Sequence, residues 1–198
     1  MVVEIRQLQK DDEDAIVDIC YTTGDDFMKW LIPTPYMFGL YFCLYYVWYE
    51  TGNCFVAEDT ETSKVIGYIL SSLDSTKQYH DFKDKMELKI KEYQERGGKF
   101  PLKTRIFSFI KFNHSISKKL VSAYPAHLHI DIFPSYQRQG IGHRLVQALE
   151  AHFRKKEVAG YHLEVGAGNK KGVSFYRKYG MNLLSKNLFG LIFGKRMD

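Results

Sequence analysis

The segment Gln-Arg-Gln-Gly-Ile-Gly at residues 137–142 combines the residue types of a turn that binds an anion. Residues 127–133 before it alternate polar and apolar side chains, which predicts a strand with one buried face that ends at Pro134. After it, apolar side chains recur at helical spacing. The first turn of a helix has unpaired backbone N–H groups, and its dipole favours negative charge. Gly140 and Gly142 lack side chains that would hold a phosphate away, so the segment predicts a pyrophosphate site.

Two common nucleotide-binding motifs do not fit this segment. A dinucleotide-binding G-x-G-x-x-G would need glycine where Leu145 stands, and the segment lacks the GK[ST] ending of a P-loop. The net charge of +5 agrees with a polyanionic ligand, although many proteins without such a ligand share it. The sequence has no basic run of the density typical of a nucleic-acid-binding arm, so we expect no nucleic-acid partner.

Length and composition indicate one soluble domain in a reducing compartment. At 198 residues the chain suits a single domain with a substantial core. Its three cysteines show neither CxxC nor Cys/His spacing, so we expect no disulfide framework, no metal and a cytoplasmic location. The charged N-terminus does not resemble a signal peptide. The apolar stretch at 37–49 is short for a membrane span of about 20 residues, so we expect a buried helix there and no membrane contact.

The order of elements predicts a mixed α/β fold. Strands are expected at 2–8, 53–58, 65–73, 127–133, 161–165, 181–184 and 188–193, and helices at 11–21, 36–50, 81–96, 101–112, 116–123, from 141 onward and at 170–179. Residues 22–35 are irregular in sequence, and Gly180 closes the last helix. The stretch 75–124 lies between the third and fourth strands. We interpret it as a helical insertion within a single domain of residues 1–198.

Two motifs in this order resemble the GNAT superfamily of acyl-CoA-dependent N-acyltransferases, whose fold is a mixed central sheet flanked by helices. Residues 137–142 match the family pattern Q/R-x-x-G-x-G/A. Asn169, followed by Phe-Tyr-Arg-Lys-Tyr-Gly-Met at 175–181, is similar to the family's second segment, with a final Met where Phe is usual. The matching residues are dense over 126–184. The sequence at 125–131 further resembles acetyltransferase-like domains related to those attached to O-GlcNAcases.

The resemblance implies how the chain would bind acetyl-CoA between splayed central strands. Backbone amides near 139–143 would bind the CoA pyrophosphate, and Arg138 or Arg144 would add positive charge. The backbone of the strand at 130–133 would polarise the thioester carbonyl. The residues that the resemblance assigns to CoA are Ile132, Phe133, Gln137, Arg138, Gln139, Gly140, Ile141, Gly142, His143, Arg144, Asn169 and Tyr176.

Two residues of the second motif have a functional and a structural interpretation. By resemblance, Tyr176 would lie near the CoA sulfur and protonate the departing thiolate. The alternative for Tyr176 is a packed aromatic side chain. Asn169 would bond the pantetheine arm of CoA or cap the helix that follows it.

A base must take a proton from an ammonium acceptor, because only the neutral amine attacks a thioester. His127, His129 and Asp131 share one face of their strand, and a histidine pKa near neutrality suits this role. Family bases commonly come from this strand, but counting back from Gly140 puts these three on its opposite face unless a bulge shifts the register. The three side chains could instead bond neighbouring loops. Glu164 on the next strand is a further candidate, and water could replace them all.

The resemblance therefore predicts acetyl transfer from acetyl-CoA to a primary amine, on a small molecule or a peptide, by direct attack in a ternary complex. The alternative is a CoA-binding or protein-interaction module of the same fold that has lost the chemistry. Formation of a homodimer is left open. The aromatic helix at 36–50 and the insertion at 75–124 would shape the acceptor site.

Overall fold

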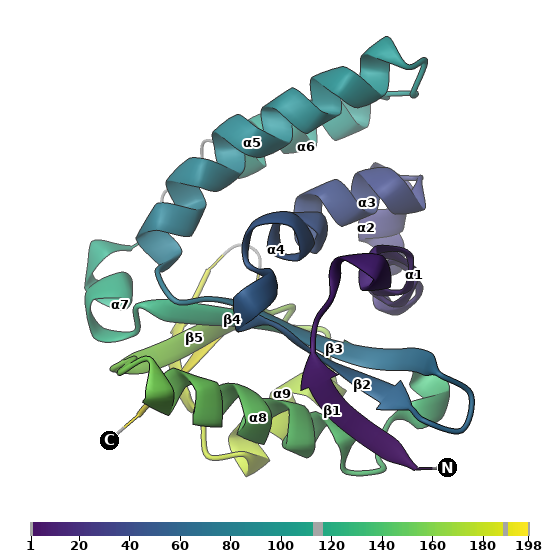
Figure 1. Ribbon diagram of the computed structural model, residues 1–198. Coiled ribbons are helices and arrows are strands. Elements are labelled where there is room, and N and C mark those ends of the chain that lie inside the picture. Colours follow the sequence, from purple (N-terminus) through teal and green to yellow (C-terminus); the bar gives the residue numbers. More distant parts are fainter. Residues whose placement is uncertain (1, 113–116, 188–189, 198) are drawn as a thin grey trace.

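The computed structural model describes residues 2–112, 117–187 and 190–197. In this part of the chain, seven strands form one mixed sheet in the order β1-β2-β3-β4-β5-β7-β6 (Figure 1). The strands are β1 (Val3–Gln7), β2 (Phe55–Asp59), β3 (Lys64–Ser72), β4 (Ala126–Ile132), β5 (Gly160–Val165), β6 (Asn182–Lys186) and β7 (Leu191–Arg196). Only β4 and β5 pair in parallel; the other neighbours are antiparallel. The predicted mixed α/β sheet is confirmed.

Helices cover both faces of the sheet (Figure 1). They are α1 (Glu13–Thr23), α2 (Asp26–Leu31), α3 (Pro35–Phe42), α4 (Leu44–Tyr49), α5 (Ser75–Glu95), α6 (Leu102–Phe112), α7 (Lys118–Ala123), α8 (Ile141–Lys155) and α9 (Lys170–Lys178). Helices α8 and α9 pack on one face, whereas α1, α3 and α4 pack on the other. Short 3₁₀ turns lie at Lys10–Asp12, Thr51–Asn53 and Pro134–Tyr136.

The alternation of β4 divides its side chains between two hydrophobic cores. Ala126 and Leu128 are buried against α8. The polar residues between and after them, His127 and His129, point to the opposite face, where they bond to α4 and α3. Successive side chains of a strand point to opposite faces, so one strand supplies both an apolar floor for α8 and a row of polar groups beneath the N-terminal helices.

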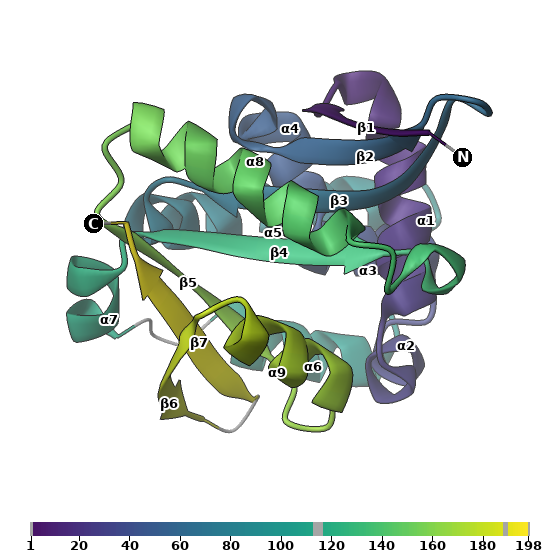
Figure 2. The same cartoon turned by 90° about the horizontal axis from the view of Figure 1, so that it is seen from below.

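The central strands β4 and β5 separate soon after they pair. Their register covers only Ala126 with Tyr161 and His127 with His162. By contrast, β4 pairs with β3 at six positions and β5 pairs with β7 at six. Beyond the first two pairs the strands diverge, and Figure 2 shows the wedge between them. The predicted splaying of the central strands is confirmed.

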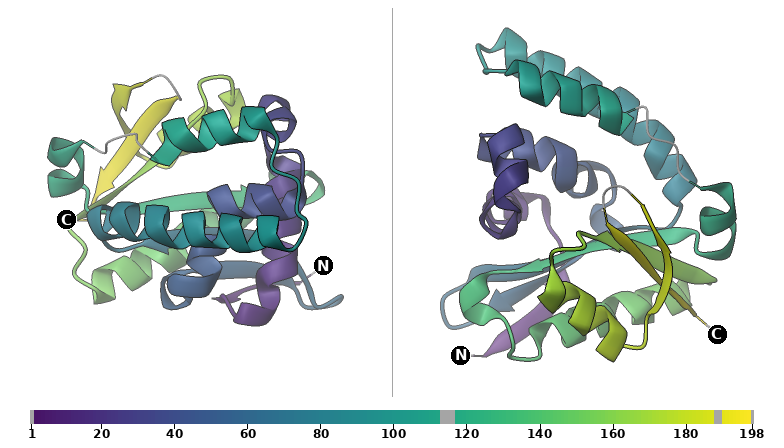
Figure 3. Two further views of the ribbon diagram at one scale, coloured as in Figure 1. Left: turned by 90° about the horizontal axis from the view of Figure 1, so that it is seen from above. Right: turned by 180° about the vertical axis from the view of Figure 1, so that it is seen from behind.

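The insertion lies between β3 and β4, as predicted, and carries α5, α6 and α7. Helices α5 and α6 run side by side beyond α3 and α4, with the diverging strands beneath them (Figure 3). Two buried hydroxyl residues hold α6 in place. Thr104 donates to the carbonyl of Leu31 at 2.5 Å, and Ser108 bonds the hydroxyl of Tyr41. No helix of the described chain is both long and apolar enough to cross a membrane.

Several predicted boundaries are wrong for identifiable reasons. The expected helix at 36–50 is broken at Cys43, whose backbone leaves the helical region, and so forms α3 and α4. The irregular stretch contains α2, because Asp25 caps it by accepting from the amides of Phe27 and Met28. The expected helix at 81–96 begins six residues earlier, at Ser75, because Asp74 caps it. The predicted positions 116 and 188–189 lie outside the described residues.

Candidate functional site

The turn before α8 exposes backbone amides at the end of β4. Gly140 caps the helix with a φ of +79°, a left-handed conformation that favours glycine. A side chain added there would meet no atom within 4 Å. The amide of Arg144 donates to the Gly140 carbonyl at 3.2 Å, so the amides of residues 141–143 precede the helical hydrogen bonds. Unpaired donors at a helix N-terminus beside open space are suited to an anion.

The second glycine of the motif has a different role from the one predicted. A Cβ on Gly142 would lie 3.4 Å from side-chain atoms of Ile132 and Phe175. Its missing side chain therefore points toward β4 and α9 rather than toward a bound phosphate. Because 3.4 Å is an ordinary contact, alanine would fit here, which agrees with the G/A alternative in the motif. Gly142 contributes its amide and its close packing.

Polar side chains of the turn hold its backbone in shape. Gln137 donates to the carbonyl of Ile132 at 2.9 Å, and Gln139 donates to that of Ser135 at 3.1 Å. Arg144 donates to the carbonyl of Val3 at 2.8 Å and so ties α8 to β1. The role of Arg144 in adding charge to a phosphate site stays a prediction. Arg138, with a φ of +65°, is a second left-handed residue in the turn.

The edge of β4 that faces β5 carries free backbone groups. The amide of Phe133 donates to the Ile66 carbonyl at 3.0 Å, on the β3 side, so it is not available for a ligand in the wedge. Because backbone groups alternate along a strand, those of Ile130 and Ile132 face β5. The Ile132 carbonyl accepts from Gln137. Within the predicted stretch 130–133, the amides of Ile130 and Ile132 are therefore the donors that face the wedge and could polarise a carbonyl.

Tyr176 of α9 is buried and packs between two aromatic rings. Its ring centroid lies 5.4 Å from that of Phe175 and 5.9 Å from that of Phe193. Within the described chain its hydroxyl has no hydrogen-bond partner. Burial raises the pKa of Tyr176, and the charge of Asp131 raises it further, so the hydroxyl stays protonated. A protonated hydroxyl without a partner is a possible donor to a ligand.

Asn169 takes the capping role that was one of its two predicted functions. Its Oδ1 accepts from the amide of Gly172 at 2.8 Å, at the first turn of α9. The side chain is exposed, and its amide nitrogen can still donate.

His127 is held as a neutral imidazole. Ser75 donates its only hydroxyl proton to the Pro125 carbonyl at 2.7 Å, so its oxygen accepts from Nδ1 of His127 at 3.0 Å. Nε2 of His127 then accepts from the hydroxyl of Tyr46 at 2.5 Å. Burial, helped by the charges of neighbouring side chains, lowers the pKa of His127 to about 3. With both ring nitrogens bonded to the protein, His127 is a structural residue, as the alternative interpretation allowed.

His129 and Asp131 form a half-buried ion pair. Nε2 of His129 lies 2.9 Å from Oδ2 of Asp131, and Nδ1 lies 3.1 Å from the Phe42 carbonyl. Tyr68 also donates to Oδ2 of Asp131, at 2.7 Å. Burial alone would lower the pKa of His129, but the charge and hydrogen bond of Asp131 outweigh it and raise the pKa to about 9. An imidazolium has no free lone pair, so His129 is not poised as a base at neutral pH.

The bulge that would have moved these side chains to the other face is absent from β4. Its register with β3 is continuous from His127 to Ile132. Glu164 on β5 is exposed, and within the described chain its carboxylate has no hydrogen-bond partner. It is therefore the predicted base candidate that is left unpaired. No three His, Cys, Asp or Glu side chains among the described residues gather closely enough to hold a metal ion.

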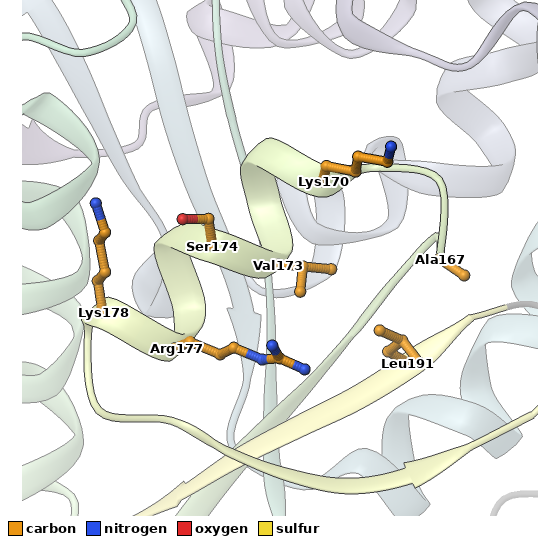
Figure 4. Close-up of a pocket in the computed structure, with 7 residues that line it drawn as sticks. All are labelled: Ala167, Lys170, Val173, Ser174, Arg177, Lys178 and Leu191. Carbon is orange, nitrogen blue, oxygen red and sulfur yellow. The ribbon is translucent and has the colours of Figure 1, made fainter.

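A hollow of about 310 Å³ lies beside α9 and includes basic residues that the sequence did not single out. Val173 and Arg177 face Leu191 across it, while Ser174 and Lys178 stand on the other flank of the helix (Figure 4). The residues that line it are Ala167, Lys170, Val173, Ser174, Arg177, Lys178 and Leu191. The two cationic side chains on the side of Leu191, which are Lys170 and Arg177, make this flank suitable for an anionic group (Figure 4).

A model of the acetyltransferase (GNAT) family matches residues 24–181. The chain belongs to this family. Its seven-stranded mixed sheet flanked by helices matches the GNAT fold, and family membership supports acetyl transfer with acetyl-CoA as co-substrate. The narrower likeness to domains related to O-GlcNAcases is not confirmed and stays a prediction.

Solved structures resemble this GNAT chain over its whole length. The crystal structure of SsHAT matches all of both chains with a TM-score of 0.83 and 25% identity. PaiA N-acetyltransferase from Thermoplasma acidophilum, in complex with coenzyme A, matches 99% of each chain with a TM-score of 0.58 and 17% identity. Polyamine N-acetyltransferase from Drosophila melanogaster matches 98% of this chain and 100% of its own, with a TM-score of 0.60 and 13% identity. The last two likenesses concern the fold alone.

Proposed function

We propose that this GNAT protein transfers an acetyl group from acetyl-CoA to a primary amine by direct attack in a ternary complex. The observation that carries the proposal is the coincidence of an open amide turn at residues 140–143 with the wedge between β4 and β5. Backbone N–H groups of two adjoining segments would donate hydrogen bonds to a phosphate group at the turn and to a thioester in the wedge. The coenzyme A complex of PaiA N-acetyltransferase supports this assignment.

Different groups of the protein bind different parts of acetyl-CoA. The amides of 141–143 bind the pyrophosphate, and those of Ile130 and Ile132 donate to the thioester oxygen. CoA carries a further phosphate on its ribose. The flank of α9 that carries Lys170 and Arg177 is our candidate for that group (Figure 4).

Proton transfer involves both faces of the wedge. Tyr176 donates its hydroxyl proton to the departing thiolate, and Glu164 or water takes the proton of the attacking amine. The acceptor approaches from the face that carries His129, Asp131 and Glu164, opposite α8. The acceptor in this proposal is a primary amine on a small molecule or a peptide.

One observation favours a second candidate function, a CoA-binding or interaction module without turnover. Both histidines of β4 are engaged by the protein, His127 as a neutral imidazole and His129 as an imidazolium. Catalysis then depends on Glu164 or on water. The same fold and turn would serve this second function, so only measurement separates the two.

Acetyl-CoA should stabilise the protein and be consumed in the presence of amines. At 100 times its dissociation constant, a ligand that binds only the folded state adds about 2.7 kcal/mol to the free energy of unfolding. Thermal unfolding with and without acetyl-CoA measures the first effect, and CoA release on a panel of amines, aminosugars and peptides measures the second. Absence of stabilisation would refute CoA binding. Stabilisation without turnover would favour the second function.

Gly140→Ala should weaken acetyl-CoA binding by about tenfold and destabilise the fold by about 1 kcal/mol. The added Cβ disfavours the left-handed backbone and occupies the open space before the amides. Gly180→Ala is the matched control, because Gly180 has a φ of +85° and equally open surroundings but lies after α9. Urea unfolding and acetyl-CoA titration compare the two variants. Equal losses of affinity in both would mean that residue 140 contributes only its conformation.

A further inference from the structure

Lys111 of α6 projects from the insertion toward the acceptor face of the wedge. Its Nζ lies 5.3 Å from the ring centroid of Phe42 and 5.9 Å from that of Phe82. The carbonyl of Phe42 is bonded to His129, so Phe42 contacts both Lys111 and a side chain of β4. Helix α6 passes over the region where β4 and β5 diverge (Figure 3).

Lys111 also interacts electrostatically with both strands of the wedge. The charge of Glu164 on β5 acts on Lys111, and the charge of Lys111 acts on His127 of β4. Together with its position over the Phe42 ring, whose residue bonds His129, these interactions place the ammonium on the face of the sheet that carries His129 and Glu164. This location is where an acceptor amine would wait in the proposed reaction.

The ammonium of Lys111 is half-buried and has no salt bridge with a described residue. Burial lowers its pKa, and the Glu164 carboxylate opposes that effect. Lys77 and Lys89 behave in the opposite way, because hydrogen bonds to Asp81 and Glu92 raise their pKa values. A lysine with a lowered pKa has a larger fraction of neutral amine, which is the form that attacks a thioester.

We propose that Lys111 is an acceptor for the protein's own acetyl transfer and becomes N-acetylated in cis. This inference rests on the proposed function. It assigns a modification site to the insertion and gives α6 a part in the chemistry of the wedge.

The step balances without any further reactant. The neutral Nζ of Lys111 forms a bond to the thioester carbonyl carbon of acetyl-CoA, and the carbon–sulfur bond then breaks. The nitrogen loses one proton to Glu164 or water, and the thiolate gains one from Tyr176 or water. The products are N-acetyl-lysine at position 111 and free CoA. Acetylation removes the positive charge from above Phe42, so the acceptor face becomes less cationic.

The test is peptide-resolved mass spectrometry of the native protein incubated with isotope-labelled acetyl-CoA. Lys111 should gain one labelled acetyl group about a hundredfold faster than exposed lysines, because it is held beside the bound thioester. Its rate should rise to a plateau and should be half-maximal at the dissociation constant of acetyl-CoA that a binding titration gives. The rate per molecule should not depend on protein concentration.

Two variants control the assignment. Lys111→Arg keeps the cation over Phe42 and cannot accept the label, so its intact mass should lack the fast acetyl group. Lys103→Arg is the matched variant on the same helix, where Nζ lies over the Trp30 ring, and it should leave the fast phase unchanged. Two results would overturn the inference. One is slow acetylation of Lys111 at a rate proportional to the acetyl-CoA concentration, and the other is an acetylation rate that rises with protein concentration. Stabilisation and amine turnover with an unlabelled Lys111 would leave the proposed function intact, whereas absence of stabilisation would remove both.

Discussion

Tyr176→Phe should lower kcat by about a hundredfold while leaving the affinity for acetyl-CoA nearly unchanged. The substitution keeps the ring that packs between Phe175 and Phe193 and removes only the hydroxyl. Within the described chain that hydroxyl bonds nothing, so its loss leaves no protein group without a partner. The departing thiolate would lose its proton donor. Steady-state rates and acetyl-CoA titration of both proteins measure the two quantities separately.

Tyr179→Phe is the matched control for Tyr176→Phe. Tyr179 lies on the turn that ends the same helix, and its ring centroid is 6.0 Å from that of Phe175. Its hydroxyl, however, interacts with Glu150, away from the wedge. Its removal should leave kcat close to the wild-type value. If Tyr176→Phe also kept the wild-type kcat, water or another donor would protonate the thiolate. If instead Tyr176→Phe lost acetyl-CoA affinity, the hydroxyl would act in binding rather than in proton transfer.

Local sequence patterns were sufficient to predict the parts of the fold that rest on local physics. The alternation at 127–133 and the glycine turn at 137–142 predicted β4, the amide turn and α8 in their correct order. Gly180 does end α9 with a positive φ. These features depend on backbone conformation and on residues a few positions apart, which a single sequence displays directly.

The state of the β4 histidines could not be predicted from the sequence, because their partners come from distant elements. The carbonyl that bonds His129 belongs to Phe42, and the hydroxyl that bonds His127 belongs to Tyr46. A histidine without such partners has a pKa near neutrality, which suits a base. In the fold, the pKa of one falls and that of the other rises, since one is buried among cations and the other faces Asp131.

The position of Lys111 could not be predicted from the sequence either. The helical pattern predicted α6 but not the direction in which each face points. That direction is set by Thr104 and Ser108, whose hydroxyls bond Leu31 and Tyr41 of the N-terminal helices. A buried threonine and serine on one helix stripe would have been the available signal, since polar residues on a packed face need partners.

Asp131→Asn should destabilise the protein by about 1–3 kcal/mol below pH 6.5, and this cost should shrink as the pH rises through 9. The upper figure is the free energy that corresponds to raising the pKa of His129 from 6.5 to about 9. The lower figure allows for the partial exposure of the His129 and Asp131 side chains, which weakens their interaction. His129 binds its proton more tightly in the folded state than in the unfolded state. Its contribution to stability is therefore complete below the unfolded pKa of 6.5 and is lost as the pH passes the folded pKa of about 9.

Urea unfolding of the wild type and of Asp131→Asn on both sides of this pH window tests the charge on His129. The matched control is Asp81→Asn, in which a half-buried carboxylate loses its ion pairs with the exposed Lys77 and with Lys85. That variant should differ from the wild type by no more than about 0.5 kcal/mol at either pH, because exposed ion pairs contribute little. A cost of Asp131→Asn that is equal below pH 6.5 and above pH 9 would mean that His129 is neutral in the folded protein. His129 would then regain its place as a candidate base, since a neutral imidazole beside Asp131 can accept a proton.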